Sequence, residues 1–101
     1  MDTARSRNGV PIRLPTERWL HITEEHSEMA GRFFEVLEAV EEADTVYAGN
    51  AGECLAVKED QPGKCLVVVY REISADDGFV ITAFLTRRRQ QIERRELLWP
   101  R

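Results

Sequence analysis

Two β-forming runs joined by a tight turn constrain the fold of this chain most. The runs KCLVVVYREI and FVITAFLT cover residues 64–73 and 79–86, and the SADDG segment between them has the composition of a turn. β-branched and aromatic residues fit the half-buried surface of a strand, whereas Asp and Gly favour turns. The tract therefore predicts a β-hairpin at the centre of an antiparallel sheet.

The first half of the chain predicts two helices. Apolar residues recur at helical spacing over 17–26, after Thr16 as a candidate N-cap, and again over 27–42, after Ser27 as a second candidate. A single kinked helix is the alternative. With an extended piece at 45–48 and a strand at 53–59, the sequence predicts an α+β domain. In it, two N-terminal helices pack on an antiparallel meander of three to four strands.

Length and hydropathy predict one domain and no membrane segment. The chain has 101 residues, of which 43% are hydrophobic, and no apolar run approaches the roughly 20 residues that span a bilayer. Residues 1–13 lack an apolar core and are expected to be a flexible tail ahead of a domain at 14–101. We expect a cytoplasmic protein in which Cys54 and Cys65 remain thiols.

Charge is divided unevenly along the chain. Residues 1–60 hold 13 acidic and 6 basic residues, a net of −7, while 61–101 hold 5 acidic and 8 basic residues, a net of +3. This division predicts one negative and one positive surface, although a solvated acidic helix face with an arginine-rich tail explains it equally well.

Turns centred between Gln61 and Pro62 and between Asp76 and Asp77 set the predicted register. Arg71 then lies opposite Thr82. The polar face carries Lys58, Arg71, Thr82 and Thr86, and the face left for the helices carries Leu55, Val57, Leu66, Val68, Tyr70, Ile81, Ala83 and Leu85. A cation beside a hydroxyl suits a metal-free phosphodiester site, and it equally suits a plain cross-strand hydrogen bond.

Three segments carry a likeness to known nucleases. They are RWLHI at 18–22 with Glu25-His26, LVVVYRE at 66–72 and GFVITAFLTRR at 78–88. Over roughly residues 14–90 the chain resembles the superfamily of barnase, EndoU, colicin and RelE-like (BECR) nucleases, and within it the phage-associated, toxin-like branch.

The resemblance implies cleavage of RNA by attack of the ribose 2′-hydroxyl, without a metal or cofactor. This chemistry needs a base, an acid and a cation near the phosphate. The implied catalytic residues are His21 as base or acid, Arg71 holding the phosphate and Thr82 orienting it. The implied substrate-binding residues are Lys58, Tyr70, Thr86 and Arg88. An RNA substrate and an antitoxin are the implied partners.

The two histidines do not form an acid–base pair on one helix. His21 and His26 are five residues apart, about 140° around a helix. His26 follows Trp19 and Ile22 on the apolar stripe, which is typical of a core or helix-end histidine, so His21 is the catalytic candidate. Two histidines and two scattered cysteines do not predict a zinc site.

The C-terminal tail combines arginines with an aromatic side chain. The arginines and Trp99 could hold and stack on RNA, whereas packing of Leu97, Leu98 and Trp99 on the body is the structural alternative. The arginines are Arg87, Arg88, Arg89, Arg94 and Arg95. A short helix over 90–97 is a further expectation.

Two functions without catalysis compete with the nuclease. The first is a protein-interaction module that binds a partner, or a second copy as a homodimer, through the acidic helix face or an open sheet edge. The second is an inactive regulatory or phage-derived domain on the same fold.

Overall fold

A computed structural model describes residues 2–101. Seven strands, two α-helices, a 3₁₀ turn and one four-residue helix follow one another along this part of the chain. In order they are β1 (Thr3–Arg5), β2 (Pro11–Arg13), α1 (Thr16–Glu25), η1 (Ser27–Met29), α2 (Phe33–Glu41), β3 (Thr45–Ala48), β4 (Cys54–Gln61), β5 (Lys64–Ser74), β6 (Asp77–Thr86), α3 (Arg89–Ile92) and β7 (Leu97–Trp99).

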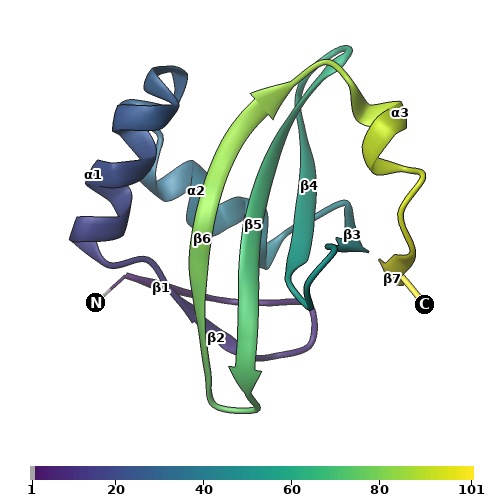
Figure 1. Ribbon diagram of the computed structural model, residues 1–101, viewed down its shortest axis with the longest axis horizontal. Helices are drawn as coiled ribbons and strands as arrows, with labels where there is room; N and C mark the ends of the chain where they lie inside the picture. Colours follow the sequence, from purple (N-terminus) through teal and green to yellow (C-terminus); the bar gives the residue numbers. More distant parts are fainter. Residues whose placement is uncertain (1) are drawn as a thin grey trace.

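All seven strands belong to one curled sheet with the order β1-β2-β6-β5-β4-β3-β7. The long strands β4, β5 and β6 form the predicted meander at its centre, and α2 crosses behind them (Figure 1). Every strand pair is antiparallel except β2 with β6, which is parallel and short, since it joins only Ile12 to Gly78 and Arg13 to Phe79.

The predicted fold class is wrong. A seven-stranded mixed sheet with short helices replaces the expected RelE-like pair of N-terminal helices on three to four antiparallel strands. The central strands and the first helix lie where they were predicted. The difference comes from β1, β2 and β7, whose three residues each are too few to display a period of two.

The N-terminal segment expected to be a flexible tail is the β1–β2 hairpin. Ala4 and Ile12 are buried in the core, and Ser6 Oγ donates to Glu72 Oε2 at 2.6 Å. The chain turns between the two strands at Gly9, whose φ of +83° is the left-handed conformation that glycine adopts most readily.

The second predicted helix is broken. Residues 27–29 form η1, and α2 begins only at Phe33. Gly31 has φ +81° between them, which no right-handed helix can contain. The break lets Met29 enter the core ahead of α2.

Two apolar clusters lie on the two faces of the sheet. The face under α1 and α2 (the helical face) contains buried residues of both helices and of strands β1 to β6, among them Ile22, Val40, Ala56, Val68 and Val80. The opposite face (the outer face) contains Tyr47, Leu55, Val57, Cys65, Val67 and, from α3, Ile92. Cys54 and Cys65 are free thiols on opposite faces, and burial raises the pKa of each.

The predicted register is wrong in both central hairpins. Lys58 pairs with Leu66 rather than Cys65, so Lys58 is on the helical side while Leu55 and Val57 are on the outer face. Arg71 pairs with Phe79 rather than Thr82. Two causes combine. Each turn is centred one residue from its predicted position, between Pro62 and Gly63 and between Ala75 and Asp76, and bulges at Glu59/Gln61, Val69/Tyr70 and Glu72/Ser74 each shift the pairing by a residue.

The first helix and the last helix also differ from expectation. Pro15, not Thr16, is the N-cap of α1, and the predicted helix over 90–97 is reduced to α3 followed by β7. Across residues 2–101, none of the helices combines the length and the apolar character needed to cross a bilayer.

Candidate functional site

Arg71 and Thr82 lie on the outer face of the sheet, but they do not contact each other. Thr82 pairs with Val69, two residues before Arg71 on β5. The Arg71 guanidinium turns toward the β3–β4 loop, where Nη1 donates to the Ala51 carbonyl at 3.0 Å. Thr82 Oγ1 is buried and has no hydrogen-bond partner among the described residues. The two groups share a face without forming one site.

Lys58 and Tyr70 lie on the helical side, away from Arg71 and Thr82. Lys58 is half-buried opposite Leu66, and Tyr70 is 1% exposed within the helical-face core. Burial raises the pKa of Tyr70 well above its ordinary value, and the nearby Cys54 and Glu72 add to the rise. A phenol in this position cannot stack on a base or supply a proton to a ligand on the outer face.

The remaining predicted residues are spread over the molecule. Thr86 ends β6, where its Oγ1 accepts from the Arg88 backbone N–H at 3.0 Å, and Arg88 is exposed. His21 is exposed on α1, with Nε2 3.5 Å from Glu25 Oε1. His26 ends that helix, and its ring centroid lies 5.9 Å from that of Phe84. His21 therefore does not meet Arg71 or Thr82.

His21 instead lines a groove between α1 and β6. The groove has a volume of about 500 Å³. Its apolar lining comes from Pro15, Ile73, Phe79 and Val80, and its polar lining from Arg13, Glu17, Arg18 and His21. Ile73 is 56% exposed there because it is the extra residue of a bulge near the tip of the β5–β6 hairpin. We call this the α1–β6 groove.

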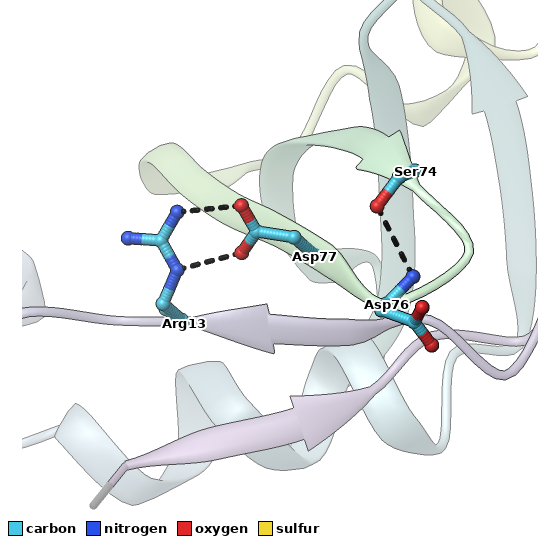
Figure 2. A network of polar contacts seen from close by, with 4 residues as sticks. All are labelled: Arg13, Ser74, Asp76 and Asp77. Carbon is cyan, nitrogen blue, oxygen red and sulfur yellow. Dashed lines mark hydrogen bonds and ion pairs between the residues drawn. The ribbon is translucent and has the colours of Figure 1, made fainter.

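A bidentate ion pair fixes one wall of the groove. Arg13 Nε and Nη2 donate to the two carboxylate oxygens of Asp77 at 2.8 and 3.1 Å, so β2 is joined to the start of β6 (Figure 2). The Arg13 hydrogen bond lowers the pKa of Asp77, and the same bond raises that of Arg13. In the adjoining turn the Asp76 backbone N–H donates to Ser74 Oγ at 3.2 Å.

Arg18 is the cation in the groove whose charge is not neutralised by a partner. It makes no ion pair or side-chain hydrogen bond with any residue from 2 to 101, whereas Arg13 is paired with Asp77 and His21 faces Glu25. Arg18 is a half-buried residue in the first turn of α1. An anionic group entering the groove would find its complement at Arg18.

Beside the groove, one side of β6 has no strand partner. β2 pairs with β6 only as far as Phe79, so residues Val80–Thr86 pair with β5 on one side and with no strand of the described chain on the other. None of these residues makes a backbone hydrogen bond to a loop or a helix terminus within residues 2–101. We call this side of Val80–Thr86 the open edge; α1 lies beside it (Figure 1), and η1 also contacts β6.

The open edge has the composition of a strand that can accept another strand. From Gly78 to Thr86 the sequence GFVITAFLT contains no charged residue and no proline, which are the usual protections of a sheet edge. The bulge at Ile81 and the neighbouring α1 and η1 are the protective features at this edge. Chemically, the groove and the edge together can hold an extended backbone, an apolar side chain and an acid.

Among residues 2–101, no metal-ligating cluster accompanies these features. Within the described chain, no group of three or more His, Cys, Asp or Glu side chains lies close enough to hold a metal ion. Sequence reasoning overlooked Arg13, Arg18 and Phe79 as lining residues. Arg13 and Arg18 flank Pro15, the helix-starting residue, and that placement of two cations around a strand-to-helix turn was the available signal.

Comparisons with protein-family models, with curated proteins and with solved structures found no match to this chain.

Proposed function

We propose that this domain is a non-catalytic protein-interaction module that binds an extended segment of a partner along the open edge. The observation that carries the proposal is the unpaired, uncharged side of β6 from Val80 to Thr86. Backbone N–H and C=O groups at a sheet edge need partners, and an added strand supplies them over several residues at once.

The α1–β6 groove would give this interaction its specificity. A segment that continues the line of β2 beyond Phe79 would place alternate side chains on the two faces of the sheet. An apolar side chain would cover Phe79 and Ile73, and an acidic side chain would pair with Arg18. The expected partner segment is therefore extended, alternately apolar and acidic.

The test uses peptides selected from a random library displayed on phage. A selected peptide should shift the amide resonances of residues 79–86 and slow the exchange of amides in Val80–Thr86, because new strand pairing protects them. Arg18→Glu should weaken binding of an acidic peptide by about tenfold or more, since it replaces a charge-assisted hydrogen bond with repulsion.

Arg94→Glu is the matched control. It makes the same charge change at an exposed residue that does not line the groove, and it should leave the affinity unchanged. If the selected peptides perturb another surface, or if no amide of Val80–Thr86 gains protection, the interaction does not use this edge.

Metal-independent cleavage of RNA is the second candidate function. It is favoured by the presence of His21 in the same groove as Arg13 and Arg18, since this chemistry needs a proton-transfer group beside a cation. Purified protein incubated with RNA in EDTA should yield cyclic-phosphate ends, and His21→Ala and Arg18→Ala should each abolish them. Cleavage that persists in both variants would come from a contaminating enzyme.

A further inference from the structure

A second pocket lies at the far end of β6 from the α1–β6 groove. It is formed where β6 leads into α3 and where the β4–β5 turn folds over, and its volume is about 240 Å³. Lys64, Arg87 and Arg89 line it, together with Gln90, Cys65 and one carboxylate, that of Glu59. We call it the basic pocket.

The cations of the basic pocket are poorly neutralised by the protein itself. Neither Lys64 nor Arg87 makes an ion pair or a side-chain hydrogen bond with residues 2–101. Arg89 Nε lies 3.4 Å from Glu93 Oε2, yet this buried nitrogen has no hydrogen bond of acceptable geometry. Lys64 and Arg87 thus have unused donors, and Arg89 beside them is paired with Glu93, in a chain whose net charge is −4.

Cys65 is a buried, uncharged part of the pocket lining. It is 2% exposed, and burial raises its pKa, so it stays a neutral thiol at neutral pH. A buried, uncharged group in the lining lowers the local dielectric constant and so strengthens the attraction between the cations and an anion.

We propose that the basic pocket is a binding site for a phosphate group. Two arginines can each offer parallel N–H donors to phosphate oxygens, and Lys64 adds a point charge. The volume exceeds that of a single phosphate, so the group can be carried by a larger molecule. Its two sources are a small phosphomonoester and the backbone of a nucleic acid. The inference does not depend on the proposed function, because the open edge and Arg18 are not part of this pocket.

The test is to titrate the protein at fixed ionic strength with inorganic phosphate, a nucleoside monophosphate or a single-stranded oligonucleotide. Amide chemical shifts and calorimetry measure the binding of each. Phosphate should shift the amides of residues 63–65 and 87–90. Arg87→Gln and Lys64→Gln should each raise the dissociation constant about tenfold, since each removes a charge-assisted contact. Circular dichroism establishes that both variants are folded.

Arg94→Gln is the control, because it removes the same charge from an exposed side chain outside the pocket. It should change the dissociation constant by less than about twofold. Tighter binding of the monophosphate identifies a small-molecule source, and tighter binding of the oligonucleotide at the same amides identifies a nucleic acid. Equal losses in Arg87→Gln and Arg94→Gln, or unmoved amides at millimolar phosphate, would overturn the proposal. Arg18→Glu should leave phosphate binding intact, so this inference and the proposed function fail separately.

Discussion

The folded protein disfavours ionisation of the Tyr70 phenol. Its side chain is buried in the helical-face core, and this burial raises its pKa above the value of about 10 that an unfolded chain shows. A raised pKa in an acid means that stability falls as the pH rises above 10, because the unfolded state alone releases the proton. In an alkaline titration, part of the tyrosinate absorbance should therefore appear only with unfolding. Tyr70→Phe should lack that part, and a wild-type phenol that titrates fully before unfolding would contradict the prediction.

The Arg13–Asp77 pair should make stability depend on pH at the acidic end. Because Arg13 lowers the pKa of folded Asp77, the pair stabilises the fold above the ordinary carboxyl pKa of about 3.9, and this stabilisation is lost as the pH falls through the lower, folded value. Asp77→Asn should therefore lower the urea midpoint at pH 7 and leave it unchanged near pH 2. Asp76→Asn, beside it in the turn, has no ion pair to lose and should change neither midpoint. A pH-independent effect of Asp77→Asn would show that the charge is not responsible.

At the scale of elements, the short turn η1 is an anchor that the sequence pattern does not reveal. Met29 is fully buried beneath the sheet, although it precedes the break at Gly31. Met29→Ala should lower the free energy of unfolding by about 2–5 kcal/mol, because it leaves a cavity in the core. Phe34, five residues later, is 74% exposed. Phe34→Ala should therefore change the free energy of unfolding by no more than about 0.5 kcal/mol. Similar losses in the two variants, measured by chemical denaturation, would place η1 outside the core.

Local pattern identified the long elements because each of them carries its own signal. β3, β5 and β6 follow runs of β-branched residues closely, and α1 is displaced by a single residue. The bulges carry no such signal: Ile73 looks like any other strand residue, yet its bulge, together with a turn at Ala75-Asp76, places Arg71 opposite Phe79 instead of Thr82. A site that depended on register could not be predicted for the same reason.

The candidate groove and the open edge depend on a long-range strand pairing that local sequence patterns do not reveal. The parallel pairing of β2 with Gly78 and Phe79 joins segments more than 60 residues apart, and it decides where β6 becomes unpaired. A three-residue strand such as β2 has no periodicity of its own, so the sequence predicted a tail there. The basic second half of the chain supplies Lys64, Arg87 and Arg89 to the basic pocket, whereas Arg18 in the groove comes from the acidic first half, so the charge division predicted one of the two cationic sites and not the other.

At the scale of the whole molecule, the β1–β2 loop contacts the C-terminal residues and connects the two edges of the curled sheet. The Arg7 guanidinium lies 4.1 Å from the Trp99 ring centroid and donates to the Ala43 carbonyl at 2.8 Å, and Arg101 Nη2 donates to Asn8 Oδ1 at 3.0 Å. These contacts connect the β1–β2 loop to β7. Strands β1 and β7 are the two outer edges of the sheet. The curl therefore depends on side chains as well as on strand pairing.

A double-mutant cycle with Arg7→Gln and Trp99→Leu measures this closure. Each variant removes one partner of the cation–π contact while keeping a side chain of moderate size, and the coupling energy should be about 0.5–1 kcal/mol, as expected for an exposed pair. In either single variant, the amides of both β1 and β7 should exchange faster, because loss of the Arg7–Trp99 contact loosens both edges of the sheet. If the two substitutions are additive and only the mutated edge exchanges faster, each edge is held by its own strand neighbour and the sheet would keep its curl without the contact between its ends.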